Sequence, residues 1–290
     1  MRISGFSFVR NAILLDYPVR EAICSALPLC DEFIVAVGNS DDDTRELVKS
    51  INSPKLRILD TQWDNSLREG GIILSQQTNI AMKECSGDWL IYVQADEVFH
   101  EDDYDIIRLE TARASAESDT DGLLFRYNHF YGNYDYVGVG RAWYRREIRA
   151  FKNGRGVMSV GDAQGFRKSG GVKLRARQTE ARVFHYGWVR HPRIQQFRQR
   201  DFNRLWHSDE WISRQIPDAD EFDYAAYELR HFTDTHPPIM AQRIVRDRSW
   251  TARFDHTRLR SKPFLMRLTD FFERKTGIRI GEFKDFMEIR

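Results

Sequence analysis

The first hundred residues alternate between short apolar runs and amphipathic helical patterns, and this alternation constrains the fold more than any other feature. Apolar runs lie at residues 3–9, 33–37, 56–59 and 89–93. Continuous runs of this length are typical of strands that are covered on both faces. Because helical patterns separate them, we expect right-handed crossovers and a mainly parallel sheet.

The pattern changes beyond residue 121. Residues 123–131, 134–144 and 172–185 read as longer, partly alternating strands with glycine-rich joints, which predicts an antiparallel extension of the sheet. Helical patterns dominate the remainder. We therefore expect an α/β domain over residues 1–190 and a helical C-terminal extension, residues 191–290, that packs on it.

The last helical pattern covers residues 263–275 and carries a row of large apolar side chains. We expect this row to pack on the domain. A weaker alternative is peripheral contact with a membrane surface, since Arg267 and Arg274 lie nearby in the sequence. The row consists of Phe264, Leu265, Leu268, Phe271 and Phe272.

Composition excludes several classes of protein. With Lys+Arg at 44 and Asp+Glu at 43, the net charge is only +1, so we expect no nucleic-acid partner. No apolar run approaches the roughly 20 residues that span a bilayer, and the N-terminal residues lack a signal-peptide pattern. The three cysteines form no Cys-x-x-Cys pair, which favours a reducing, cytoplasmic location.

The near-zero net charge conceals a strong asymmetry of charge along the chain. Residues 84–121 hold 12 acidic and 2 basic side chains, whereas residues 141–204 hold 17 basic and 4 acidic ones. The two segments could simply attract each other as solvated faces. Alternatively, a basic wall could face an acidic, cation-binding edge, which would suit a substrate that carries phosphates.

The segment with the clearest chemical pattern is an apolar strand that ends in Asp96 and Glu97. Ligands of parallel sheets bind beyond the carboxyl ends of the strands, and carboxylates placed there can hold Mg²⁺ or Mn²⁺ together with substrate phosphates. The alternative is that these acids merely begin the next helix. Neither a Gly-x-Gly-x-x-Gly motif after the first strand nor a Walker loop occurs.

Several segments, taken in order, resemble the family 2 glycosyltransferases, which have the GT-A fold. The match is good over about residues 3–97, moderate over 132–190 and loose elsewhere. Asn79 lies eight residues before Gly87, as in the helix that precedes the acidic motif of this family. The other matching segments are SFVRN (7–11), DYP (16–18), SAL (25–27), DEFIVAVGNSDDDT (31–44) and QADE (94–97).

The resemblance implies a nucleotide-sugar bound over the parallel sheet. Asp96 matches the last acid of the family's Asp-x-Asp motif and would bind a divalent metal, Mn²⁺ or Mg²⁺, that bridges the diphosphate. Gln94 replaces the first acid of that motif. Residues 37–38 stand where the family often has acids that contact the base, which leaves Asn39 as a weak substitute, and Thr78 stands where an arginine often contacts the nucleotide, with Gln77 beside it. The residues implied for nucleotide-sugar binding are Phe8, Val9 and Arg10 near the base and ribose, together with Asn39, Gln77 and Asp96.

Two later residues complete the expected site. A histidine from a late segment can complete the metal site in GT-A enzymes, so His185 is the second ligand candidate; the alternative is a core histidine. Inverting members use a carboxylate as the base, and Asp162 is the only acid between Glu147 and Glu180. The alternative for Asp162 is an ion pair in its loop with the neighbouring Arg167 or Lys168.

These observations predict a GT-A-like α/β fold and an inverting, metal-assisted glycosyltransferase. It would transfer a sugar from a nucleotide-sugar to a hydroxyl of a glycan or glycolipid precursor, in cell-envelope polysaccharide synthesis. The alternatives are a non-catalytic nucleotide-sugar-binding protein and a nucleotidyltransferase of similar fold. We expect Asp96→Ala to abolish turnover with little loss of folding. Candidate phosphate contacts are Arg145, Arg146, Arg167 and Arg190.

Overall fold

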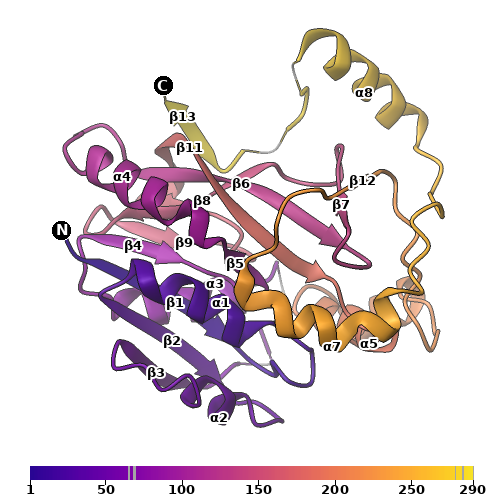
Figure 1. Ribbon diagram of the computed structural model, residues 1–290, viewed down its shortest axis with the longest axis horizontal. Helices are drawn as coiled ribbons and strands as arrows, with labels where there is room; N and C mark the ends of the chain where they lie inside the picture. The colour runs from indigo at the N-terminus through magenta and orange to yellow at the C-terminus, as the bar shows by residue number, and fades with distance from the viewer. Residues whose placement is uncertain (65, 68–69, 278, 283, 290) are drawn as a thin grey trace.

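A computed structural model describes residues 1–64, 66–67, 70–277, 279–282 and 284–289 (Figure 1). The strands are β1 (Ile3–Val9), β2 (Glu32–Gly38), β3 (Leu56–Thr61), β4 (Trp89–Tyr92), β5 (Glu97–Phe99), β6 (Gly122–Tyr131), β7 (Tyr136–Gly138), β8 (Arg146–Lys152), β9 (Val157–Ser159), β10 (Phe166–Lys168), β11 (Val172–Trp188), β12 (Leu229–His231) and β13 (Phe286–Ile289). The α-helices are α1 (Val19–Ala26), α2 (Thr44–Lys49), α3 (Ile72–Lys83), α4 (Tyr104–Ser115), α5 (Pro192–Asn203), α6 (Asp209–Gln215), α7 (Ala241–Thr251) and α8 (Phe264–Thr276).

The strands form one large sheet whose central path runs β3-β2-β1-β4-β8-β6-β11-β10-β9. Strands β1 to β4 pair in parallel. Strand β8 is antiparallel to both of its neighbours, β4 and β6, while the long strand β11 is parallel to β6. The predicted fold class is therefore confirmed: an α/β protein with a mainly parallel sheet and an antiparallel extension.

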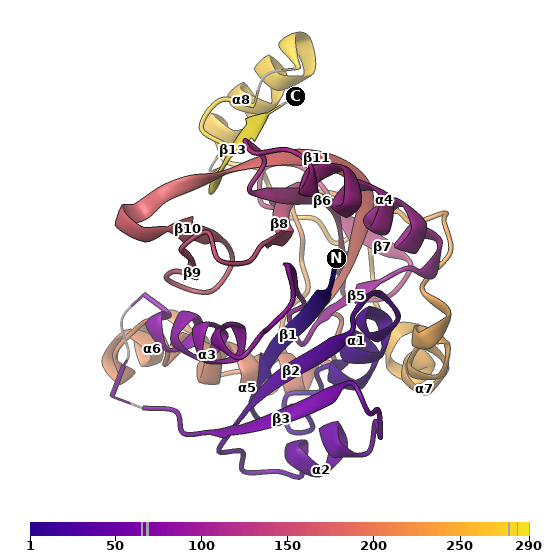
Figure 2. The ribbon, with the colours of Figure 1, turned by 90° about the vertical axis from the view of Figure 1, so that its left-hand side faces the viewer.

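Apolar side chains cover both faces of the parallel part of the sheet. Along β2, Phe33 and Val35 point into one buried cluster, which α1 and α4 close, while Ile34 and Ala36 point into a second cluster, which α3 closes. Figure 2 shows these helices on opposite faces of the sheet. Successive side chains of a strand alternate between faces, so a strand covered on both sides reads as a continuous apolar run.

The sequence prediction fails in the antiparallel part. A single strand over residues 134–144 was expected, but only the short strand β7 forms there. The neighbouring strand β8 was not expected, because its charged residues conceal its burial. Its Arg149 is completely buried beside apolar neighbours such as Ile148 and Ala150.

The acidic and basic segments of the chain lie against each other and form ion pairs. Examples are Lys168 with Asp121 at 2.7 Å and Arg175 with Asp119 at 2.9 Å. Basic side chains of β10 and β11 thus form ion pairs with acidic side chains in the region that follows α4. This arrangement agrees with the simpler of the two interpretations, in which the segments attract each other.

The C-terminal hundred residues contain helices α5 to α8 together with two short strands. Strand β12 pairs with β7, and β13 pairs in parallel with the start of β11. The expectation that the apolar row of α8 packs on the domain is wrong: Phe264 is 78% exposed and Phe271 is 61% exposed. Among the described residues, no helix is both long and apolar enough to span a membrane.

Candidate active site

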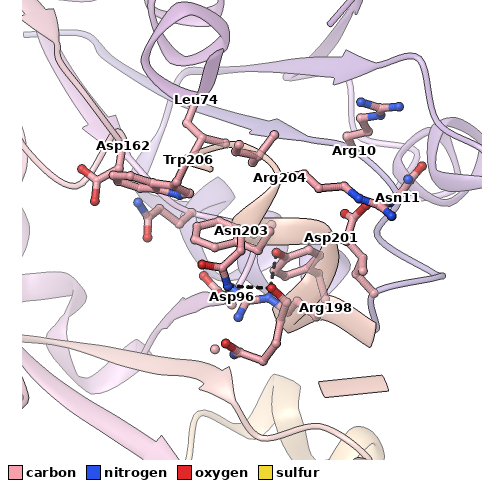
Figure 3. A pocket seen from close by; sticks show the side chains of 18 of the residues that line it. Arg10, Asn11, Leu74, Asp96, Asp162, Arg198, Asp201, Asn203, Arg204 and Trp206 are labelled. Atoms are coloured by element: carbon pink, nitrogen blue, oxygen red, sulfur yellow. Dashed lines mark hydrogen bonds and ion pairs between the residues drawn. The ribbon is translucent and has the colours of Figure 1, made fainter. Parts of the chain in front are cut away.

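A cavity of about 920 Å³ lies beyond the carboxyl ends of β1 and β4, the edge where parallel sheets bind ligands (Figure 3). One wall comes from the segment that follows β1, and the opposite wall comes from residues 198–209, at the end of α5 and just beyond it. The residues predicted for the site that line this cavity are Phe8, Val9, Arg10, Asp96, Asp162 and His185.

Two predicted residues, Asn39 and Gln77, lie outside the cavity lining. The Asn39 side-chain oxygen accepts a hydrogen bond from the backbone nitrogen of Trp63 at 2.9 Å. Gln77 is completely buried on α3, and its Nε2 donates to the carbonyl of Gln62 at 3.3 Å. Both side chains therefore hold the segment after β3 in place, and neither lines the cavity.

Asp96 lies in the tight turn between β4 and β5 and is only 6% exposed. Its Oδ2 is 3.7 Å from Nη2 of Arg190 and 3.9 Å from Nη2 of Arg198. Burial by itself raises the pKa of Asp96, but the positive charges around it, among them the guanidinium groups of Arg190 and Arg198, lower it by more, so the net pKa is below the ordinary value. Asp96 is therefore a buried, ionised carboxylate, and not the solvent-edge group that we expected.

The neighbouring carboxylate, Glu97, serves a different purpose. Both of its oxygens accept hydrogen bonds at 2.8 Å from Arg149, and both side chains are fully buried. The hydroxyl of Tyr127 donates to Glu97 at 2.6 Å. Of the two adjacent acids found in the sequence, only Asp96 faces the cavity, while Glu97 neutralises a buried arginine.

The hydrogen-bond network around His185 fixes which ring nitrogen carries its proton. Nε2 of His129 lies 2.8 Å from the carbonyl oxygen of Tyr144 and must donate to it. Burial lowers the pKa of His129 far below its ordinary value, so this ring is neutral and its Nδ1 is an acceptor. Nδ1 of His185, at 3.0 Å, is then the donor. Burial also lowers the pKa of His185, which leaves its Nε2 unprotonated.

The unprotonated Nε2 of His185 lies 3.8 Å from Oδ1 of Asp96. No cluster of three or more acidic, histidine or cysteine ligands occurs among the described residues. Mg²⁺ and Mn²⁺ usually take only one or two protein ligands beside substrate phosphates, so Asp96 and His185 are the two side chains that would hold such an ion.

Gly187 allows the two candidate ligands to approach each other. A Cβ atom at this position would lie 2.5 Å from Nε2 of His185 and 2.8 Å from Oδ2 of Asp96, closer than real contacts permit. The register between β11 and β6 shifts at this point, between His185 and Trp188. The irregular end of β11 and the missing side chain together make room for the pair.

Asp162 lines the cavity at a distance from Asp96, beside Trp206 (Figure 3). Its Oδ1 accepts a hydrogen bond from the backbone nitrogen of Gln164 at 3.2 Å. The two cations that could have paired with it are used elsewhere, since Arg167 pairs with Asp285 and Lys168 with Asp121. The alternative interpretation of Asp162, as a loop acid paired with one of these two residues, is therefore wrong.

The end of the cavity near β1 is aromatic and basic. The rings of Phe8 and Trp63 lie 6.0 Å apart, and the guanidinium group of Arg10 lies 5.5 Å from the centre of the Trp63 ring. Trp63 was not predicted, because it follows β3 in a segment without any recognisable motif. Its ring supplies a flat apolar surface of the kind on which a base can stack.

Most of the arginines that the sequence analysis named as candidate phosphate contacts form ion pairs away from Asp96. Arg145 pairs with Glu282 and Arg146 pairs with Glu288. Arg167 pairs with Asp285. Of the four candidates, only Arg190 lies beside Asp96. The sequence did not single out Arg198, which lines the cavity and donates to the hydroxyl of Tyr17 at 3.1 Å. One arginine among many in α5 gave no signal that could have distinguished it.

Glu147 on β8 provides a prediction about pH. The Glu147 side chain is buried. Its Oε1 accepts a hydrogen bond from Nε2 of Gln164 at 2.8 Å, and its Oε2 has no hydrogen-bond partner among the described residues. Burial raises its pKa from the ordinary 4.5 to about 7. The folded state therefore retains the proton over this range, and its stability falls as the pH rises through it.

We expect the free energy of unfolding of the wild type, measured relative to Glu147→Gln, to fall by roughly 3 kcal/mol between pH 4.5 and 7 and to stay level above that range. Urea unfolding of both proteins across this range measures the difference. Groups that titrate alike in the two proteins cancel from the comparison. A difference that does not change with pH would contradict the raised pKa.

A scan against protein-family models finds no matching family, and a search of curated proteins finds no match. Solved structures are similar to this chain in part. TarS 1–349 from S. aureus in complex with UDP is 22% identical, with a TM-score of 0.35, over 49% of this chain and 38% of that one. TarS 1–349 in a further structure is 13% identical, with a TM-score of 0.37, over 74% and 69%.

A third similar structure is glucosyl-3-phosphoglycerate synthase from Mycobacterium tuberculosis in complex with Mn²⁺, uridine diphosphate and phosphoglyceric acid. It is 18% identical, with a TM-score of 0.31, over 45% of this chain and 43% of that one. The chain thus spans about two fifths of the length of this structure, and the same is true of the UDP complex of TarS.

Proposed function

We propose that the protein is a glycosyltransferase of the family 2 type, which transfers a sugar from a nucleotide-sugar to a hydroxyl of a glycan or glycolipid precursor. The observation that carries the proposal is that one cavity at the ligand edge of the sheet is lined by Phe8, Arg10, Asp96, Asp162 and His185. These residues come from distant parts of the sequence, and the sequence resemblance had assigned each of them to this site.

The donor would lie with its nucleoside against the aromatic end of the cavity and its diphosphate near Asp96. Phe8, Trp63 and Arg10 offer a stacking surface and a positive charge there. Arg198 reaches the cavity beside Asp96 and can contact phosphate oxygens. Its guanidinium group would stabilise the negative charge that develops on the departing nucleoside diphosphate.

The proposed reaction is a single displacement with inversion at the anomeric carbon. Asp162 takes the proton from the acceptor hydroxyl, whose oxygen forms the new bond while the bond from the anomeric carbon to the diphosphate oxygen breaks. Arg198 and Arg190 hold the site around Asp96 positive as the diphosphate leaves. A divalent cation, when bound by Asp96 and His185, would supply further neutralisation of that charge.

A panel of nucleotide-sugars, screened with and without Mn²⁺, tests the proposal. We expect one class of nucleotide-sugar to raise the melting temperature and to release nucleoside diphosphate during turnover. If a nucleotide-sugar raises the melting temperature but no nucleoside diphosphate is released, even when acceptor glycans are present, the protein would be a non-catalytic binding protein. Release of pyrophosphate from a nucleoside triphosphate and a sugar phosphate would instead indicate a nucleotidyltransferase.

The Asp162→Asn variant isolates the role of the base. We expect its affinity for the donor to equal that of the wild type and transfer to fall by about a hundredfold or more, because no group at this position then accepts the acceptor's proton. Asp64→Asn is the matched control, since Asp64 is an exposed loop acid that binds Ser66. Donor affinity is measured by calorimetry and transfer by product formation; unchanged transfer would contradict the assignment.

We further propose that the protein acts in the cytoplasm on cell-envelope precursors. The support for this location is that Cys24, Cys30 and Cys85 are all free thiols, as is usual in a reducing compartment. Burial raises the pKa of Cys30 and Cys85, so neither is a reactive thiolate. Thiol labelling of the folded protein checks this, since Cys30 and Cys85 should react only after unfolding.

A further inference from the structure

Helix α8 exposes its apolar face to solvent. Five of its large apolar side chains recur at the spacing that places them on one side of a helix, and each of these five is exposed. Figures 1 and 2 both show α8 at the edge of the molecule, away from the helices that cover the sheet. The exposed fractions are 78% for Phe264, 70% for Leu265, 54% for Leu268, 61% for Phe271 and 40% for Phe272.

The opposite, polar face of α8 attaches the helix to the rest of the chain. Asp270 is buried and pairs with Lys262 at 2.7 Å. Glu273 accepts from Arg141 at 2.9 Å and from Arg279 at 3.2 Å. The helix is thus held by its charged side and presents its apolar side outward, the reverse of a helix that packs on a hydrophobic core.

The surroundings of this apolar face are basic. Residues 253–279 carry eight basic and three acidic side chains, and the ion pairs just described occupy two of those three acids. On α8 itself, Arg267, Arg274 and Lys275 are exposed. A partner for this surface must therefore offer both an apolar phase and negative charge.

We propose that α8 lies flat in the headgroup region of an anionic lipid bilayer. Its phenylalanine and leucine side chains would enter the acyl boundary, and its arginines and lysine would contact the acidic headgroups. A second copy of the same chain suits the surface less well, since each copy would bring the same excess of positive charge. The helix does not line the cavity, so this inference is independent of the proposed transfer reaction.

Flotation with lipid vesicles tests the proposal on the full chain. We expect binding to vesicles of phosphatidylcholine with phosphatidylglycerol, weaker binding to phosphatidylcholine alone, and loss of the difference at high salt. The double variant Phe264→Ser/Phe271→Ser should bind about tenfold more weakly or worse. The double variant Arg274→Ser/Lys275→Ser should bind the anionic vesicles roughly thirtyfold more weakly.

The matched control is Val245→Ser, which removes an exposed apolar side chain (67% exposed) from α7 and should leave vesicle binding unchanged. Circular dichroism checks that the helices persist in each variant. Equal binding of wild type and Phe264→Ser/Phe271→Ser would overturn the proposal. So would a concentration-dependent dimer in lipid-free sedimentation that this variant abolishes, because the occupant would then be a second copy. Both results leave the proposed transfer reaction untouched, because donor turnover is measured separately.

Discussion

Asp96→Asn should lower sugar transfer by roughly a hundredfold to a thousandfold, because the cavity then lacks the ionised carboxylate of Asp96 while its shape is unchanged. The variant should also lose any gain in donor affinity that Mn²⁺ gives the wild type. Calorimetric titration of the donor, with and without Mn²⁺, measures this second effect separately from turnover. Asp105→Asn, at a fully exposed acid on α4, is the control.

The same variant should destabilise the fold, in contrast to what the sequence led us to expect. Arg190 is buried and the side chain of Arg198 is only 11% exposed, and both lose a nearby counter-charge when Asp96 becomes neutral. We expect a loss of roughly 2 kcal/mol in urea unfolding, the usual worth of an interaction with a charged group. Full transfer activity in Asp96→Asn would remove the carboxylate from the proposed mechanism, whatever its stability.

The second prediction with a large expected effect concerns the stability of the fold and not catalysis. Arg149→Met should lower the free energy of unfolding by roughly 3–5 kcal/mol, because it leaves the Glu97 carboxylate buried without its cation. The long apolar side chain of methionine is similar in size, so the loss of packing is small. The guanidinium group also lies 5.3 Å from the ring of Tyr92 and 5.4 Å from that of Tyr127, and these contacts are lost too.

A double-mutant cycle separates these contributions. In Arg149→Met/Glu97→Gln no charge remains buried, so the double variant should be more stable than Arg149→Met by about 1–3 kcal/mol. Urea unfolding of the four proteins gives the coupling energy. If the double variant were the least stable of the four, burial of an unpaired carboxylate could not be the cause of the loss.

The parallel half of the fold could be predicted from the sequence because its strands β1, β2 and β4 are mainly apolar and are buried on both faces. The bounds of β1 were predicted correctly, and those of β2 and β4 within one residue. Strand β8 was missed because its burial depends on an ion pair with Glu97, a residue about fifty positions away in the chain. Such a contact leaves no local periodicity.

The candidate site was predictable to a similar extent. Asp96 follows β4 at the ligand edge, and His185 lies near the end of β11; the sequence resemblance assigned both to one site. The sequence could not distinguish Asp96 from Glu97 by function, since only the turn before β5 determines which of them faces the cavity. Trp63 and Arg198 come from segments without a motif, and tertiary packing alone brings them to the cavity wall.

The opposite orientation of Asp96 and Glu97 makes this turn intolerant of changes in length. With the flanking strands kept in place, deleting one residue between β4 and β5 would move Glu97 to the place of Asp96 and Val98 to the place of Glu97, whereas an insertion would put Asp96, one methylene shorter, below Arg149. Stability and chemistry would then fail together, although both acids were retained. Over this stretch of chain, natural variation should therefore alter side chains but preserve their number.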